Sequence, residues 1–144
     1  MPPPAWFFTA IAAMVGLHVF LPGPVLVPDP WTLLGLAPIA AGVALNIAAV
    51  AAFRRRATTT DPDGAPAALV SDGPYRLSRN PMYAGGVLVL LGFAVLLGSA
   101  LPFLVPPLYG ALAAADFVPR EERKLVAAFG DEWRSYAARV RRWI

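Results

Sequence analysis

Long apolar stretches dominate the sequence, and turn-forming or charged residues separate them. Residues 5–21 are apolar except for one threonine and one histidine, and prolines flank them on both sides. Residues 32–53 carry no charge and are long enough, as a helix, to cross a hydrocarbon core of about 30 Å. Residues 82–118 are too long for one span, and Gly98 to Pro102 is a plausible turn in their middle. The pattern predicts four membrane spans, at residues 5–21, 32–53, 82–98 and 101–118.

The first apolar stretch has a secretory signal peptide as its alternative interpretation. Residues 1–4 lack the positive charge with which such peptides begin, and no clear small-residue cleavage site follows the stretch. We therefore expect it to be a span that stays in the membrane.

The basic residues test the four-span arrangement, because four spans place both chain ends on one side of the membrane. Five of the twelve lysines and arginines lie between the second and third spans, and the other seven follow Val118. The two loops expected on the opposite side carry only Asp29 as a charge. Cytoplasmic loops carry an excess of lysine and arginine, so both termini are predicted to be cytoplasmic.

Residues 119–144 form a tail with a different pattern. Apolar residues recur there at spacings of three and four, with charged residues elsewhere around the helical wheel. This pattern predicts an amphipathic helix on the membrane surface. Gly130 costs about 1 kcal/mol inside a helix, so it is also a candidate break between two helices.

Composition limits the classes of protein that fit. The sequence is 58% apolar and 15% charged, which is typical of a membrane protein rather than a soluble domain. The absence of cysteine excludes disulfides, thiolate metal sites and a cysteine nucleophile, and we find no pattern for a metal site. We predict an all-α integral membrane helical bundle that is a single domain over residues 1–144, with a cytoplasmic loop at 57–81 and the tail at 119–144.

Three polar features away from the loop suggest no chemistry. His18 lies near a span end, where a lone histidine is usually interfacial or packed. Asn46 lies mid-span and should face the bundle and bond across helices. The run from Arg54 to Arg56 is short and adjoins a span, which favours orientation and contact with anionic lipid over nucleic-acid binding.

The segment before the third span carries the most chemistry. Pro81 suits the first helical position, so the span should begin there and leave the backbone N–H groups of Met82, Tyr83 and Ala84 without helical partners. Free N–H groups at a helix N-terminus form an anion site, which could bind a carboxylate. Gly85 and Gly86 follow, and either a ligand or a neighbouring helix could approach their backbone closely.

A second group of polar residues begins the tail. The carboxylate of Glu121 could accept both hydroxyls of a ribose, as acidic residues do in nucleotide sites. The helix dipole alone would also favour an acid in this first turn. Spacing does not separate these two explanations.

The order of these motifs resembles the isoprenylcysteine carboxyl methyltransferase family and its relatives among phospholipid methyltransferases. The family motif, Arg-His-Pro-x-Tyr after Gly-x-Tyr, has its counterpart in Gly73-Pro74-Tyr75 and Arg79-Asn80-Pro81-Met82-Tyr83. Glu121-Glu122 and Phe129-Gly130-Asp131-Glu132-Trp133 follow in the expected order, so the resemblance covers roughly the last 85 residues.

The resemblance implies a site for S-adenosylmethionine between the loop and the start of the tail. The cofactor contacts that it implies are Leu69, Val70, Tyr75, Asn80, Pro81, Met82, Tyr83 and Glu121. The substrate contacts that it implies are Arg79, Phe117 and Arg139. The resemblance gives no position for a catalytic base.

Two departures from the family pattern bear on the substrate. Asn80 replaces the family's histidine, so a role that needs an imidazole is lost while hydrogen bonding through the amide can survive. Phe117 replaces an arginine thought to meet the carboxylate of prenylcysteine substrates. Arg139 matches a second basic position, although Arg141 and Arg142 beside it equally suit a basic patch for lipids.

We therefore predict a methyltransferase that uses S-adenosylmethionine and acts on a lipophilic or prenylcysteine-like substrate entering from the bilayer, with membrane lipids and no nucleic acid as partners. One alternative is an NADPH-dependent membrane reductase of the sterol-reductase type, which has a similar C-terminal pattern but needs more spans. The other is a non-catalytic small membrane protein that kept the fold.

Overall fold

The computed structural model describes residues 3–58 and 66–144, and the regular secondary structure in these ranges is helical. The helices are α1 (Pro3–Phe20), α2 (Leu36–Arg55), α3 (Pro81–Leu97), α4 (Val105–Leu112) and α5 (Val118–Arg139). Short turns of 3-10 helix lie at Trp31–Gly35, Gly73–Arg76 and Leu101–Leu104, and a π turn covers Ala113–Phe117. The predicted all-α class is confirmed. Residues 59–65 of the predicted loop 57–81 lie outside the described ranges.

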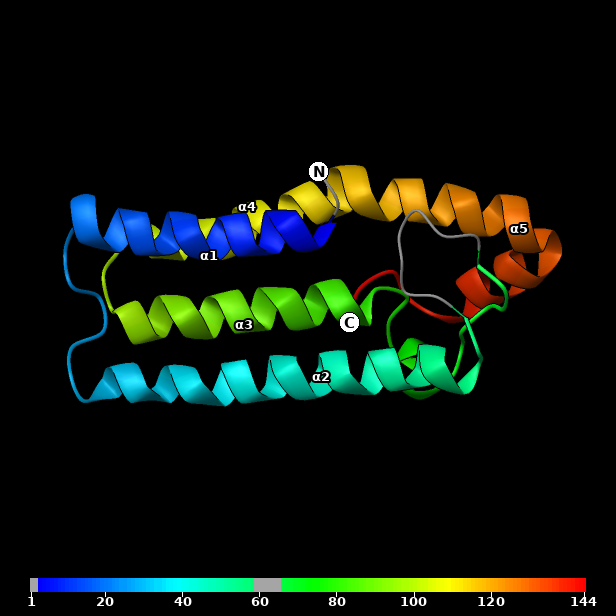
Figure 1. The fold of residues 1–144 in the computed structure, drawn as a ribbon, viewed down its shortest axis with the longest axis horizontal. Helices are drawn as coiled ribbons and strands as arrows, with labels where there is room; N and C mark the ends of the chain where they lie inside the picture. Colours follow the sequence, from blue (N-terminus) through cyan, green and yellow to red (C-terminus); the bar gives the residue numbers. More distant parts are fainter. Residues whose placement is uncertain (1–2, 59–65) are drawn as a thin grey trace.

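The long helices run antiparallel, with α3 in the middle (Figure 1). On one side α3 faces α2, and on the other it faces α1 and α4. The connections at residues 21–30 and 98–101 lie at one end of the bundle, and residues 66–80 lie with α5 at the other. We call the latter the basic end, because the lysines and arginines of the described residues lie there.

Glycine allows α2 and α3 to approach closely. Gly42 of α2 faces Gly85 of α3, and Gly35, the residue just before α2, faces Gly92, so glycines lie seven residues, about two turns, apart on both sides of the contact. A Cβ added at Gly42 would stand 2.5 Å from the carbonyl oxygen of Gly85, which no real side chain tolerates. Of the two roles considered for Gly85, the structure thus shows close helix packing.

Asn46 packs against Gly85, but its amide bonds within its own helix. Its Nδ2 donates to the carbonyl oxygen of Gly42 at 3.0 Å. The prediction of a bond across the helices was wrong for Nδ2, because Gly85 opposite it has no side chain and the carbonyl oxygen one turn back is within hydrogen-bond distance.

The turn at Gly98 joins α3 to the next helical segment, as predicted. Gly98 has φ 71°, a left-handed conformation that suits glycine, and its carbonyl oxygen accepts hydrogen bonds from the N–H groups of Leu26 and Val27. His18 Nδ1 lies 2.8 Å from the hydroxyl of buried Ser99. The histidine is therefore packed against this turn.

Two helical segments are long and apolar enough to cross a membrane, Trp31–Arg55 and Leu101–Arg139. Pro4–Phe20 and Pro81–Leu97 are apolar but shorter, so the four-span arrangement stays a prediction. Helical structure continues from Leu101 to Arg139, so the predicted boundary at residue 118 between a fourth span and the tail falls inside a continuous helical segment and stays a prediction. The break comes at Gly130, where φ 51° and ψ −115° kink α5.

Candidate functional site

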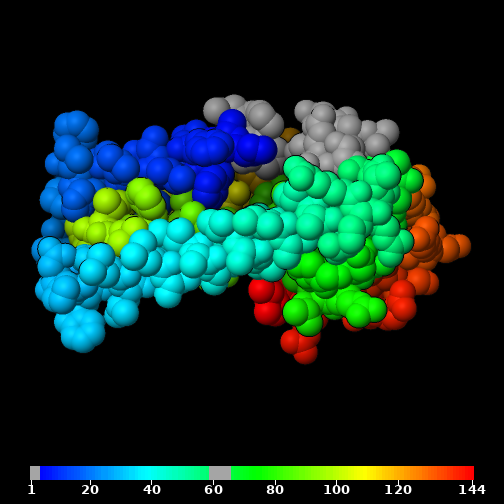
Figure 2. All heavy atoms as spheres, turned by 60° about the horizontal axis from the view of Figure 1, so that its bottom comes forward, coloured from blue at the N-terminus to red at the C-terminus, as the bar shows by residue number. Residues whose placement is uncertain are grey.

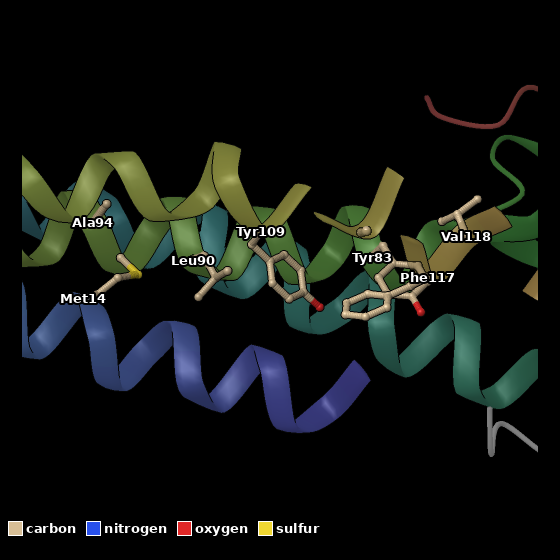
Figure 3. Close-up of a cluster of buried hydrophobic side chains, with 8 residues drawn as sticks. Met14, Tyr83, Leu90, Ala94, Tyr109, Phe117 and Val118 are labelled. Atoms are coloured by element: carbon tan, nitrogen blue, oxygen red, sulfur yellow. The ribbon is translucent and has the colours of Figure 1, made fainter. Parts of the chain in front are cut away.

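The site lies at the basic end, where α3 begins and α5 follows the π turn. Tyr83, in the first turn of α3, donates a hydrogen bond of 2.6 Å from its hydroxyl to Oε1 of Glu121 in the first turn of α5. The ring of Tyr83 also stacks on Phe117, with centroids 6.1 Å apart and planes at 23° (Figure 3). Residues 38 positions apart in sequence thus form one group, in which the two aromatic rings are buried and Glu121 is partly buried.

The π turn explains why Phe117 and Glu121 share a face. Tyr109, Ala113, Phe117 and Glu121 are spaced by four, and the first three belong to the same buried cluster as Tyr83. In a regular α-helix each step of four overshoots a full turn by about 40°, so the fourth residue would point away. The wider π turn at Ala113–Phe117 absorbs part of this drift and keeps Glu121 directed at Tyr83.

Burial is the main influence on the pKa of the Glu121 carboxyl. Desolvation raises the pKa of this carboxyl, while the hydrogen bond from Tyr83 and the charge of Lys124 lower it in part. Glu121 is thus a carboxyl in a partly buried, water-poor position that already accepts one hydrogen bond. A carboxylate has two acceptor oxygens, and the bond from Tyr83 uses Oε1.

Residues 69–75 form a neighbouring apolar cluster with α2 and α5. Leu69, Val70 and Tyr75 are buried there beside Trp133 and Tyr136 of α5. Tyr136 donates a hydrogen bond of 2.7 Å to the carbonyl oxygen of Tyr75. Burial raises the pKa of Tyr136 to about 12 and raises that of Tyr75 as well, so both hydroxyls keep their protons at neutral pH.

Arg79, in the loop before α3, makes polar contacts with two side chains of α5. Its Nη1 lies 3.1 Å from Oε1 of Glu122, and its guanidinium carbon lies 5.7 Å from the ring centroid of Trp133. Glu122 also pairs with Arg142, at 2.6 Å to Nη2 and 3.2 Å to Nε. Nε of Arg79 is buried and has no hydrogen-bond partner among the described residues. A buried donor of this kind is expected to have an acceptor, which a ligand could supply.

Asn80 holds the start of α3. Its carbonyl oxygen accepts from the N–H of Ala84 at 3.2 Å, and its Nδ2 donates to the carbonyl oxygen of Arg142 at 3.0 Å. The prediction that the Ala84 N–H is free was therefore wrong, because the helical ladder begins one residue before Pro81. Only the N–H groups of Met82 and Tyr83 precede the first helical bond, so the anion site is smaller than expected.

The structure brings together Asn80, Pro81, Tyr83, Phe117 and Glu121, with Arg79 beside them. Leu69, Val70, Tyr75 and Met82 lie in the neighbouring cluster instead. Arg139 is apart from both, because it is exposed and its Nε donates to the carbonyl oxygen of Ser135 on its own helix.

Sequence reasoning gave no role to two residues that organise the site. Glu122 joins Arg79 to Arg142, and Ser78 donates to the carbonyl oxygen of Arg142 at 3.3 Å. Ser78 has no special sequence signal. Glu122 does, since a second acid beside Glu121 and a set of arginines within helical reach could have suggested an ion-pair network.

Comparison with known proteins agrees with the motifs. The family model of phospholipid methyltransferases matches residues 31–132, which include every cofactor contact that the resemblance implied. An uncharacterised protein of Haemophilus influenzae is 36% identical over 63 residues, which are 44% of this chain and the whole of that protein. No solved structure matches. The chain belongs to the phospholipid methyltransferase family, a family of membrane methyltransferases.

Proposed function

We propose that the protein transfers a methyl group from S-adenosylmethionine to a lipophilic substrate in the membrane. The observation that carries this proposal is the pairing of Tyr83 with Glu121 at 2.6 Å, beside the Asn80-Pro81 motif. It joins the two sequence segments that the family resemblance assigns to the cofactor, and it does so at the end of the bundle where a polar cofactor could arrive from water.

The chemistry of the residues present fits this cofactor in three places. The second oxygen of Glu121 can accept ribose hydroxyls. The aromatic faces of Tyr83 and Phe117 suit a positively charged sulfonium. The unpartnered Nε of Arg79 and the N–H groups of Met82 and Tyr83 can donate to a carboxylate.

S-adenosylmethionine supplies an activated methyl group, so the protein need not supply a strong base. The contributions of the chain are to orient the two reactants and to exclude water. Buried Phe117 and Tyr83 would form the dry wall at the reacting end, and Glu121 would fix the cofactor from the polar side.

The buried position of Phe117 argues for a substrate without a carboxylate near the methyl acceptor. Phe117 is 6% exposed and stacked on Tyr83, so nothing there can pair with an anion. An acidic or phosphate group on the substrate would meet Arg139 at the exposed surface, because the free Nε of Arg79 is assigned to the cofactor carboxylate. A lipid whose polar group lies at the interface satisfies both conditions better than a prenylcysteine does.

The membrane arrangement is part of the proposal. Large apolar side chains of α1 and α2, among them Phe8, Val19 and Ile47, are exposed, and lipid would cover them. We propose four spans with both termini on the cytoplasmic side, which places the basic end and the cofactor in the cytoplasm.

The test is calorimetric binding of S-adenosylmethionine and of NADPH to the detergent-purified protein. Saturable binding of S-adenosylmethionine, weakened at least tenfold by Glu121→Gln, supports the proposal, because the substitution removes the charge that a ribose would meet. Glu132→Gln is the matched control, since Glu132 is exposed on the same helix. It should leave the affinity unchanged.

Two other results would redirect the proposal. Binding of NADPH in place of S-adenosylmethionine would favour the reductase alternative. Binding of S-adenosylmethionine without transfer of a labelled methyl group to any lipid extract would favour a non-catalytic relative.

A further inference from the structure

After α5 the chain returns to the site. Val140 is extended, with φ −118° and ψ 132°, and the residues that follow run beside the segment that precedes α3. In Figure 2 the red spheres of these residues lie next to the bright-green spheres of that segment. We call residues Val140–Ile144 the strap.

The strap accepts hydrogen bonds from three consecutive residues. The backbone N–H of Arg79 donates to the carbonyl oxygen of Arg141 at 2.9 Å. The hydroxyl of Ser78 and the side-chain amide of Asn80 both donate to the carbonyl oxygen of Arg142, at 3.3 and 3.0 Å. Ser78 is 1% exposed and Asn80 7%, so with the strap in place these donors are shielded from water and need an acceptor within the protein. The strap supplies one.

Side chains of the strap reach the rest of the site. Arg142 forms a two-pronged ion pair with Glu122. Trp143 packs against the cluster that contains Tyr83 and Phe117. Ile144 lines, with Pro81 and other apolar residues, a pocket of about 300 Å³, yet it is itself 76% exposed. Ile144 therefore adds little holding force. The strap is held by the packing of Trp143 and by polar contacts, and the polar contacts can exchange for others.

We propose that the strap is an internal competitor that must leave Asn80 before S-adenosylmethionine can bind. The inference rests on the proposed function, because Asn80, Pro81 and Tyr83 are cofactor contacts that the family resemblance implies. The strap bonds to Asn80, lines a pocket together with Pro81, and packs through Trp143 against the cluster that contains Tyr83. The apparent dissociation constant then equals the intrinsic one divided by the fraction of molecules in which the strap is open.

The latch of this device is the pair between Arg142 and Glu122. The side chain of Arg142 is 45% exposed, so salt should weaken the pair and raise the open fraction. Substitution Arg142→Ala removes the latch but keeps the backbone carbonyl. Arg141→Ala is the matched control, because Arg141 is the neighbouring exposed arginine and contributes its backbone carbonyl to the contacts described above.

The experiment measures the strap and the cofactor separately. The chain has no cysteine, so Ile144→Cys accepts a single nitroxide whose mobility reports the strap by electron paramagnetic resonance. Calorimetry gives the affinity for S-adenosylmethionine. We expect Arg142→Ala to raise the mobile fraction and to tighten binding roughly two- to tenfold, whereas Arg141→Ala changes neither. Saturating S-adenosylmethionine should mobilise the nitroxide in the otherwise unsubstituted protein, and added salt should tighten its binding.

Several outcomes would overturn the inference. An unchanged mobile fraction in Arg142→Ala would show that the ion pair is not the latch. A mobile strap with unchanged or weaker binding would show that the strap is a wall of the site and not a competitor. If no variant binds S-adenosylmethionine, the proposed function fails together with this inference, whereas binding by the unsubstituted protein that no strap variant alters would overturn the strap alone.

Discussion

The α2–α3 interface and the basic end join helices by opposite means. Between α2 and α3, paired glycines let backbone meet backbone, and no charged side chain takes part. At the basic end, Tyr83, Glu121, Arg79 and Glu122 join α3, α5 and the loop through directed hydrogen bonds and ion pairs. The α2–α3 interface permits one packing arrangement, because the backbone atoms of the two helices are already in contact. The second contains donors and acceptors that can exchange partners, which a ligand site requires.

The difference predicts where stability and where binding reside. Close packing of backbone on backbone depends mainly on the shape of the contact, so an added side-chain atom disrupts it. Polar contacts at the basic end each contribute about 1 kcal/mol when exposed or neutral and more when a charge is buried. Substitutions in the first region should therefore unfold the protein, and substitutions in the second should mainly change binding and its pH dependence.

The largest effect is expected from Gly42→Leu. A Cβ at this position would overlap the carbonyl oxygen of Gly85 and the side chain of Val89, so α2 and α3 must separate. We expect a loss of stability of more than about 3 kcal/mol or failure to recover folded protein, measured by circular dichroism during thermal unfolding in detergent.

Gly16→Leu is the matched control for that substitution. Gly16 lies in α1, and a Cβ there would have no neighbour within 4 Å. The control should unfold at nearly the temperature of the unsubstituted protein. Equal loss in both variants would show that the close approach of α2 and α3 is not what stabilises the fold.

A smaller, pH-dependent effect is expected from Tyr83→Phe. The variant removes the hydrogen bond that lowers the pKa of Glu121, so that only the charge of Lys124 still opposes the effect of burial and the folded-state pKa rises further above its unfolded value. A group whose pKa is higher in the folded than in the unfolded state stabilises the fold at pH values below its unfolded pKa. This contribution is lost as the pH rises through the folded-state pKa. The deficit of the variant should thus grow with pH, to about 1–3 kcal/mol once Glu121 is charged.

Melting temperatures between pH 4 and pH 8 measure this effect. Tyr109→Phe is the control, because Tyr109 lies in the same cluster and its hydroxyl makes no hydrogen bond with the described residues. A deficit that is constant with pH, or one that Tyr109→Phe reproduces, would contradict the assigned role of the pair.

The sequence predicted the local features of this structure, such as turns and helix ends, better than it predicted contacts between distant residues. The turn at Gly98 and the break at Gly130 could be predicted because glycine permits backbone conformations that other residues resist. The start of α3 at Pro81 was equally local. The glycine register of α2 against α3 was not predicted, since Gly35 and Gly42 gain meaning only from the helix opposite.

The candidate site shows the same limit. The family motif named Tyr83 and Glu121 as parts of one site, but nothing in the spacing showed that they bond to each other. The π turn that aligns Phe117 with Glu121 has no residue signature. Arg142 suited a lipid-facing patch by sequence, and only the path of the chain after α5 places it on Glu122.

The smallest effect is expected where the basic end meets water. Asp72 lies 3.3 Å from Nη2 of Arg55 and 3.2 Å from Nε of Arg56, and despite some desolvation these hydrogen bonds lower the pKa of its carboxyl. A lowered pKa contributes stability above the unfolded pKa of the group, and that stability is lost as pH falls through the folded pKa. Both arginines are about half exposed, so water and salt screen the pairs.

Asp72→Asn should therefore cost at most about 1 kcal/mol of stability at pH 7 in low salt, and nothing in 1 M salt or at a pH below the folded-state pKa of Asp72. Thermal unfolding at these conditions checks it, and a cost that persists in high salt would mean that Asp72 positions the loop before Tyr75 by its shape and not by its charge.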